Sequence, residues 1–258
     1  MVRGLYEAAL GMNTAMKKLD VVSNNIANVD TVGFKKDTVV TQSFSDELMK
    51  RLGDPALNEL RPNTAIGKMQ LGLTVDNVVT KFTTGAFKVT NNDFDTCIDG
   101  DGFYSVQVTD PSGNVSTKYT RDGLFTTAND VLVSNDGNPI LGQNGIIRIP
   151  PSAKMTIDEY GNVYADSDLV DQLQMTSFTD NATLRKYGDN LYNTTDDSVK
   201  SNFAGKVRQG MTEASNVNSV NEMVDMIVVN RWYEANQRVV TTIDSTLDKS
   251  VNVVGAQR

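Results

Sequence analysis

Both ends of the chain carry a long stretch of helical periodicity without proline, whereas all six prolines lie between residues 55 and 151. A helix interior excludes proline because its ring removes a backbone donor and clashes with the preceding turn. The two ends can therefore form continuous helices, and the segment between them needs a different architecture.

The N-terminal stretch, residues 5–29, repeats its apolar residues every seven positions. Leu5, Met12, Leu19 and Ile26 form one series, and Ala8, Ala15, Val22 and Val29 follow three residues after each of them. This a/d heptad pattern predicts an amphipathic helix with a narrow apolar seam. The turn-forming residues Asn28, Asp30 and Gly33 predict that the helix ends near residues 28–33, and we expect Gly33 to hold a backbone conformation that side chains resist.

The second proline-free stretch spans residues 217–254. Its apolar stripe consists of Val220, Val224, Val228, Ala235, Val239, Ile243, Leu247, Val251 and Val254. This spacing predicts a second long amphipathic helix. Ser219 followed by Glu222 can form a capping box at its start, and Asn218 is the competing cap.

The segment between the helices has the pattern of an antiparallel β structure. Short runs rich in Val, Ile, Thr, Phe and Tyr alternate with turn dipeptides such as Ser112-Gly113 and Asp136-Gly137. Strands at this spacing indicate a sandwich or a barrel-like body. Residues 41–60 contain a weakly amphipathic piece with Phe44, Leu48 and Leu52, which fits either a short helix or a loop.

The chain contains no histidine and one cysteine, Cys97. Without histidine, the usual general base and every Ser-His or Cys-His nucleophile arrangement are missing. One cysteine allows no intramolecular disulfide and no tetrahedral thiolate metal site. We therefore expect no catalytic residues, no cofactor and no metal.

The charge of the chain also limits its partners. The net charge of −8 argues against binding to a phosphate backbone, which needs a basic surface, so nucleic acid is not an expected partner. Residues 1–30 and 206–258 are each neutral, so the negative charge sits between them. No apolar run reaches the ~18–20 residues of a membrane-spanning helix, and the N-terminus lacks the pattern of a cleaved secretory signal.

Several residue groups suggest sites that have simpler explanations. Asp93, Asp95, Asp99 and Asp101 resemble a calcium loop, but Cys97 occupies a ligand position, and a β-turn with unusual backbone angles at Gly100 and Gly102 is preferred. Trp232 and Tyr233 fit helix packing better than a ligand platform. Arg121 and Asp122 suggest a charge pair, although a hairpin turn is simpler. The sequence also allows two carboxylates to converge as in a glycoside hydrolase, but no motif supports such a pair.

Residues 23–35 carry a specific resemblance. Asn24, Asn25 and Asn28 at the helix end, followed by Gly33 and Phe34, resemble the N-terminal signature of flagellar axial proteins. The matching C-terminal signature resembles residues 215–218 together with Glu222, Met223, Val224, Met226, Ile227, Arg231, Tyr233, Glu234, Asn236 and Asp244. Two paired motifs at opposite ends are much more specific than either motif alone.

The central segment extends the resemblance over essentially the whole chain. Asp95, Ile98, Gly100, Gly102, Phe103, residues 119–123, Phe125, Gly188 and residues 190–192 look like the β-domain signatures of rod and hook proteins. The length favours flagellar basal-body rod proteins of the FlgG and FlgF types over the longer hook protein. The opening residues 1–6 and residues 222–227 favour the distal rod type, whereas residues 138–142 suit the proximal type equally well.

The resemblance implies a structural subunit rather than an enzyme. Such subunits leave the cytoplasm through the flagellar type III export apparatus without a cleaved signal and polymerise into the helical drive shaft between motor and hook. The expected partners are further copies of the chain and other rod and hook proteins, without membrane insertion. The alternatives are a proximal rod or hook-type axial protein and, more remotely, a secreted binding module or hydrolase.

The implied fold class is α+β, in which the two terminal helices pair as a coiled-coil-like domain beside a central antiparallel β-rich domain. The expected domains are residues 1–35, 36–205 and 206–258. The expected assembly interface consists of Leu5, Met12, Leu19, Asn24, Asn25, Ile26, Asn28, Gly33, Phe34, Val224, Ile227, Arg231, Tyr233, Glu234, Asn236, Val239 and Ile243. Because isolated amphipathic helices are marginal, we expect both termini to be mobile in the free subunit and ordered after assembly.

Overall fold

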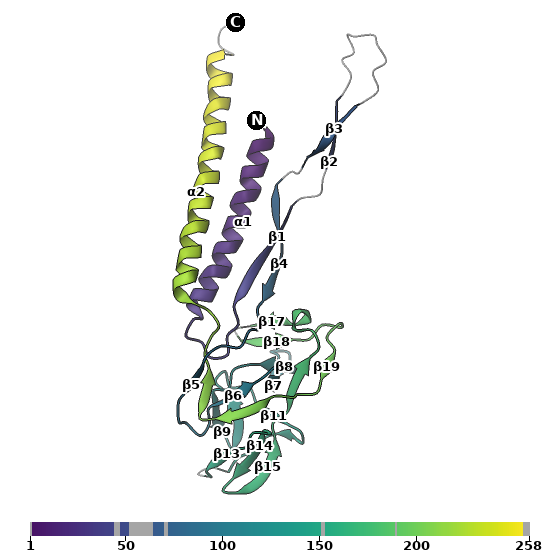
Figure 1. The fold of residues 1–258 in the computed structure, drawn as a ribbon, viewed down its shortest axis with the longest axis vertical. Helices are drawn as coiled ribbons and strands as arrows, with labels where there is room; N and C mark the ends of the chain where they lie inside the picture. The colour runs from purple at the N-terminus through teal and green to yellow at the C-terminus, as the bar shows by residue number, and fades with distance from the viewer. Residues whose placement is uncertain are drawn as a thin grey trace. The chain divides into compact units, whose positions relative to one another are not determined.

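The computed structural model describes residues 2–43, 47–51, 64–69, 72–150, 153–188 and 190–254 (Figure 1). The chain divides into two compact units. The first consists of residues 1–26, 37–79 and 219–258, and the second of residues 27–36 and 80–218. Each unit is therefore built from segments that are distant in sequence.

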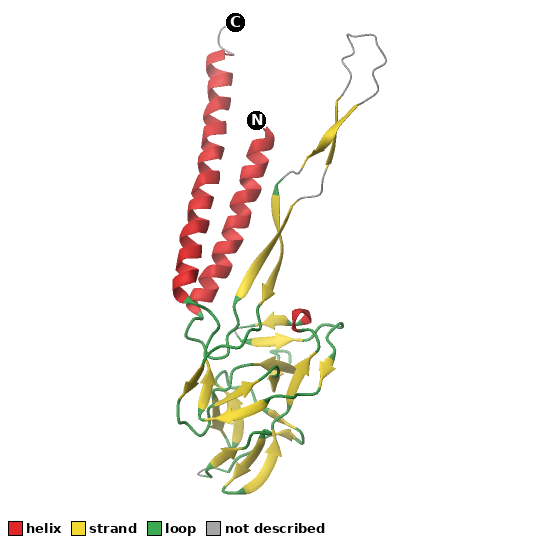
Figure 2. Cartoon of the chain, in the orientation of Figure 1, coloured by secondary structure: helices red, strands yellow, loops and turns green. Residues whose placement is uncertain are grey.

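The first unit contains two helices that run antiparallel (Figure 2). Helix α1 spans Val2–Ala27 and α2 spans Ser219–Lys249, followed by a π-helical turn at Ser250–Val254. The helix α1 ends directly before the turn-forming residues at positions 28–33. Helix α2 begins at Ser219, which leaves Asn218 in the position before the first helical residue.

The same unit contains two pairs of strands. Strand β1 (Asp37–Ser43) pairs with β4 (Leu73–Thr80), and β2 (Glu47–Arg51) pairs antiparallel with β3 (Thr64–Met69). Residues 41–60 were expected to form either a short helix or a loop, but residues 47–51 within them form a strand. Phe44 and Leu52 of this segment lie outside the described residues.

The second unit is a β body around a six-stranded antiparallel sheet, ordered β17-β18-β8-β7-β16-β19. These strands are β7 (Phe103–Thr109), β8 (Val115–Thr120), β16 (Met175–Phe178), β17 (Arg185–Tyr187), β18 (Leu191–Asn193) and β19 (Lys200–Ser201). A short 3-10 helix, Asn181–Thr183, precedes β17. Hairpin connections of this kind agree with the expected antiparallel β structure.

Smaller sheets complete the β body. The three-stranded sheet consists of β13 (Met155–Ile157), β14 (Asn162–Ala165) and β15 (Asp168–Gln172). The remaining antiparallel pairs are β9 (Phe125–Ala128) with β10 (Val131–Ser134), β11 (Leu141–Gly142) with β12 (Gly145–Ile146), β6 (Thr96–Asp99) with β20 (Lys206–Gln209), and β5 (Phe87–Val89) with β21 (Met211–Glu213). The strands β20 and β21 of the β body thus fill most of residues 206–213.

Two groups of buried side chains stabilise the β body. The larger is mainly aliphatic and includes Val106, Leu132, Ile140 and Val163. The smaller is mainly aromatic: Phe103, Tyr119, Phe178, Leu184 and Tyr192. Its rings pack edge to face or tilted, with centroids 5.0–5.8 Å apart, which is the arrangement that the ring quadrupole favours. The body therefore has a core of its own.

The predicted fold class is wrong. Among the described residues only two helices longer than one turn occur, of 26 and 31 residues, beside twenty-one strands. The helices also do not form a separate coiled-coil-like domain, because α1 divides its contacts between α2 and the strand β4. The Thr14 hydroxyl lies 3.3 Å from the Leu73 carbonyl oxygen, and a Cβ on Gly72 would lie 3.2 Å from the Leu10 side chain. The expected β-rich centre agrees with the structure.

Neither of the described helices contains an apolar window long enough to cross a bilayer. The expected domain boundaries at residues 35 and 205 separate segments that should fold independently, and this division stays a prediction. The strands β20 and β21 and the residues 27–36 belong to the β body in the structure.

Candidate assembly site

The end of α1 is fastened to its own unit by one buried asparagine. The Asn25 side chain donates from Nδ2 to the Asp37 carbonyl oxygen at 2.9 Å and to Glu222 Oε2 at 3.1 Å. Its Oδ1 accepts from the Asp37 backbone N–H at 3.0 Å. Because buried polar groups need partners, this side chain holds the end of α1, the start of β1 and the first turn of α2 together.

The segment after α1 enters the β body through a sharp turn. Asn28 Oδ1 accepts from the Thr31 hydroxyl at 3.1 Å. Gly33 follows with φ +70°, so the expected unusual backbone conformation is confirmed. Its N–H donates to the Glu213 carbonyl oxygen at 2.8 Å. The next side chain, Phe34, is fully buried beneath the Lys186 ammonium, which lies 3.9 Å from the ring centroid.

Gly33→Ala is expected to destabilise the β body more than its backbone angle alone explains. A Cβ at this position would lie 2.5 Å from the Arg121 carbonyl carbon and 2.7 Å from the Asp122 nitrogen. The positive φ costs about 1–3 kcal/mol, and displacement of this backbone adds to it. Gly113→Ala is the matched control, because Gly113 has φ +83° and a Cβ there would meet nothing within 4 Å. Urea unfolding should show the larger loss for Gly33→Ala, and equal losses would refute the close approach.

A buried ion cluster follows directly after this turn. The Lys35 ammonium donates to Glu213 Oε1 at 2.5 Å and to the Thr83 carbonyl oxygen at 2.8 Å. Both side chains of the ion pair are at most 1% exposed. Burial lowers the pKa of the Lys35 ammonium, and the neighbouring Glu213 carboxylate opposes that shift. The segment after α1 is therefore attached to β21 by a charge pair that needs both partners.

The Glu213 carboxylate accepts two further hydrogen bonds. The Gly85 backbone N–H donates to Oε1 at 2.9 Å, and Arg121 Nη1 donates to Oε2 at 3.4 Å. Arg121 Nη2 also donates to the Gly100 carbonyl oxygen at 2.7 Å. One carboxylate thus joins four segments of the β body. Arg121 therefore pairs with a residue 92 positions away and not with the adjacent Asp122, the alternative to the simpler hairpin turn.

Two of the aspartates near Cys97 bind other side chains of the β body. Asp95 Oδ1 accepts from Asn92 Nδ2 at 2.8 Å, and Asp99 pairs with Arg208 at 2.6 Å. Gly100 has the expected positive φ of +126°, but Gly102 does not. Cys97 is fully buried, and burial raises the pKa of its thiol to about 11. Within the described residues, no group of three or more Cys, Asp or Glu side chains is placed to hold a metal ion.

The predicted interface residues of α1 lie on its packed side. Leu5, Met12, Leu19 and Ile26 are half-buried, whereas Asn24 is exposed. Helix α2 approaches α1 closely beside these residues at Gly11, where a Cβ would lie 2.9 Å from the Asn236 amide. Among the described residues, the heptad seam is therefore only partly covered.

The predicted interface residues of α2 fall into two groups. Tyr233, Asn236 and Ile243 are half-buried, and Asn236 and Ile243 face Gly11 and Gly4 of α1. The others, Val224, Ile227, Arg231, Glu234 and Val239, are exposed. The neighbouring Trp232 packs beside α1, with the Lys18 ammonium 5.3 Å from its ring centroid, so a helix-packing role agrees with its place.

The outer face of α2 consists of Val220, Val224, Ile227 and Val228, each between 54% and 66% exposed. These positions follow the i, i+4, i+7, i+8 spacing of one helix face. Glu222, Asn236 and Ile243, which contact α1, occupy the other side of the helix. Helix α2 therefore has one side toward α1 and a second, apolar side that the described residues leave uncovered.

Family models match three parts of the chain. The model described as Flagella basal body rod protein matches residues 5–35. The Flagellar hook protein FlgE/F/G D1 domain matches residues 97–165, and Flagellar basal body rod FlgEFG protein C-terminal matches residues 208–253. These matches cover most of α1 with the turn after it, the centre of the β body, and β21 with α2.

Curated relatives match the chain from end to end. It is 34% identical over 270 aligned residues to Flagellar basal-body rod protein FlgG of Bacillus subtilis, with 98% of this chain and 99% of the relative covered. The chain belongs to the flagellar basal-body rod protein family. It is also 34% identical to FlgG of Borreliella burgdorferi, with 98% and 99% covered, and 32% identical to FlgF of Caulobacter vibrioides, with 98% and 97% covered. Members of this rod family are structural proteins, so the chain is not an enzyme.

Sequence reasoning missed the residues that attach the family signature to the β body. Glu213 carried no signal, because nothing in its surroundings distinguishes it from a solvated acid. Arg121 lies in a recognised motif, but its sequence neighbourhood favoured a hairpin turn and did not indicate Glu213 as its partner. The Lys35 and Glu213 positions are 178 residues apart, and only the folded topology brings them together.

Proposed function

We propose that the chain is a structural subunit of the flagellar basal-body rod and that it forms the distal part of the rod. In this proposal it polymerises through its terminal helices into the helical shaft between motor and hook. Its partners are further copies of itself and the neighbouring rod and hook proteins. The flagellar export apparatus delivers it without cleavage of a signal peptide.

The uncovered outer face of α2 is the observation that best supports polymerisation through the helices. Burial of one such valine or isoleucine side chain contributes about 1.5–3 kcal/mol. A helical array repeats one interface without closing it, so every subunit must present the same uncovered surface. The neutral charge of both chain ends suits a place where helices from many copies crowd together.

The distal position rests on the opening residues 1–6 and on residues 222–227, and relatives of both rod types match the chain. Immunogold labelling of basal bodies isolated from the source bacterium tests the position. An epitope tag placed after Ser112 in the exposed turn of β7 and β8 should bring gold to the hook-proximal part of the rod. Gold near the motor would instead assign the chain to the proximal rod. Basal bodies without gold, from cells that express the tagged chain and swim, would refute a role in the rod.

A further inference from the structure

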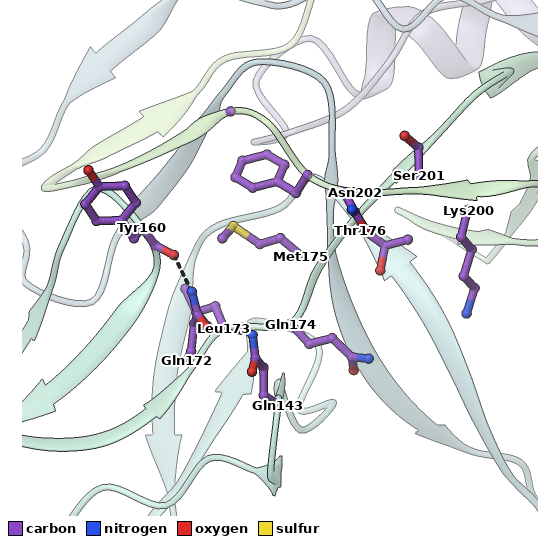
Figure 3. A pocket seen from close by; sticks show the side chains of 12 residues that line it. Gln143, Tyr160, Gln172, Leu173, Gln174, Met175, Thr176, Lys200, Ser201 and Asn202 are labelled. Atoms are coloured by element: carbon purple, nitrogen blue, oxygen red, sulfur yellow. Dashed lines mark hydrogen bonds between the residues drawn. The ribbon is translucent and has the colours of Figure 1, made fainter.

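The β body contains a cleft of about 470 Å³ beside the edge of the six-stranded sheet (Figure 3). This volume lies in the range of small-molecule sites. The cleft lies where β16 and β19 separate, since their pairing consists of Ser177 with Ser201 and Phe178 with Lys200. Residues 172–176 form one wall, and residues 200–203 form the other.

The backbone of the first wall is already used within the protein. The N–H groups of Leu173 and Gln174 donate to the carbonyl oxygens of Gly161 and Leu141. The carbonyl oxygens of Gln172 and Gln174 accept from Gln143 and Ser105. A peptide that adds to a sheet edge needs a continuous run of free backbone groups. The polar groups left for a ligand are therefore mainly side chains.

Those side chains are mostly neutral amides. Gln143 Nε2 donates to Gln172 Oε1 at 2.6 Å, and Gln172 Nε2 donates to the Tyr160 carbonyl oxygen at 3.0 Å, which fixes both amides (Figure 3). Gln174 and Asn202 form no side-chain hydrogen bond with the described part of the chain. An amide can both donate and accept. The described residues around the cleft include one cation, Lys200, and no carboxylate, although the chain carries a net charge of −8.

The cleft also has an apolar part. Leu173 is buried, and Met175 and Phe203 are half-buried beside it. Two glycines lie against the Phe203 ring, since a Cβ on Gly102 or on Gly205 would lie 2.5 or 2.7 Å from it. The ring is therefore held in one orientation. The exposed Tyr160 ring stands at the rim.

We propose that this cleft binds a neutral oligosaccharide. A sugar ring presents hydroxyl groups at its edge and C–H groups on its faces. The amides of Gln174 and Asn202 can pair with the hydroxyl groups, while Phe203 and Met175 cover a C–H face. A strongly charged ligand is disfavoured, because Lys200 is the one charged side chain among the described residues around the cleft, and a buried charge needs a partner. The proposal does not depend on the role in the rod.

Ligand-observed NMR with the full chain, kept dilute to avoid polymerisation, tests the proposal. The probes are chitotetraose, maltotetraose and an uncharged capped tetrapeptide of serine, valine, threonine and alanine. We expect at least one saccharide to bind with a dissociation constant of about 1 mM. Gln174→Ala combined with Asn202→Ala should weaken that binding at least about tenfold, because two hydrogen bonds are lost. Asn114→Ala, an exposed asparagine in the turn between β7 and β8, is the matched control and should leave binding unchanged.

Three results would overturn the proposal. One is the absence of saturable saccharide binding at concentrations about tenfold above the expected constant. Another is binding of the tetrapeptide alone, which would assign the cleft to an extended peptide. The third is saccharide binding that the double variant leaves unchanged although its thermal unfolding equals that of the control, because the sugar would then bind elsewhere.

Discussion

Glu213→Ala is expected to lower the free energy of unfolding of the β body by about 3–5 kcal/mol. The substitution leaves the Lys35 ammonium without its carboxylate at a place where its side chain is fully buried. It also removes the acceptor of the Gly85 N–H and of one Arg121 nitrogen. Urea unfolding, followed by near-ultraviolet circular dichroism of the tyrosines in the body, measures the loss.

Glu159→Ala is the control for this experiment. Glu159 also pairs with a lysine, Lys206, at 2.6 Å, but both side chains are about two-thirds exposed. Exposed pairs contribute little because water and salt screen them. Glu159→Ala should therefore change the unfolding midpoint only slightly. A loss for Glu213→Ala that is as small as that of the control would show that the cluster does not hold the body together.

Val224→Asp combined with Val228→Asp is expected to prevent polymerisation while the chain stays folded. The two valines lie on the outer face of α2, where they are 54% and 58% exposed among the described residues, so their substitution should disturb the folded chain little. If each is covered in the rod, the loss of burial alone is at least about 3 kcal/mol per interface, or more than about a hundredfold in the association constant. Buried aspartates add a further desolvation cost.

Electron microscopy of concentrated chain measures the effect, and Asn230→Asp combined with Gln237→Asp is the matched control. The control adds the same two charges to exposed polar positions of the same helix. Filaments should form with the control and not with the valine variant. If the valine variant assembles at the same concentration as the unchanged chain, the outer face of α2 is not an interface between subunits.

Local signals in the sequence predicted local structure well. The end of α1 and the conformation of Gly33 follow from turn chemistry within a few residues, and the turn dipeptides of the centre predicted hairpins. The strand β2 shows the limit of such signals. Phe44, Leu48 and Leu52 are spaced as on a helix, yet residues 47–51 pair with β3. The partner strand decides the structure of this segment, and its pairing is invisible in the local pattern.

The predicted fold class is wrong because the pattern of an apolar seam does not determine which element of the fold packs against it. The heptad pattern of α1 was interpreted as a seam for one helix, whereas the structure shares it between α2 and strand β4. Small residues such as Gly11 allow this close approach. The same ambiguity affects α2, whose stripe was predicted as one surface but has a side toward α1 and an outer face.

The sequence predicted a set of interface residues, and the structure shows what those residues do within one chain. Asn25, Gly33 and Phe34 share one family signature, yet the structure uses Asn25 to join the helices to β1, and Gly33 and Phe34 to enter the β body. Their role between subunits stays a prediction. The exposed residues Val224 and Ile227 are the part of that set best placed to meet another chain.

Hydrogen exchange of α1 and α2, compared between the dilute chain and the assembled rod, tests assembly through the terminal helices most directly. Because packing against a partner supplies most of the stability of an amphipathic helix, the backbone amides of residues 219–249 should exchange rapidly in the dilute chain. In the rod they should be strongly protected, while the protection of strands β7 and β8 stays unchanged. Equal and strong protection of α2 in both states would show that the helices are complete without further subunits, and would contradict the proposed assembly.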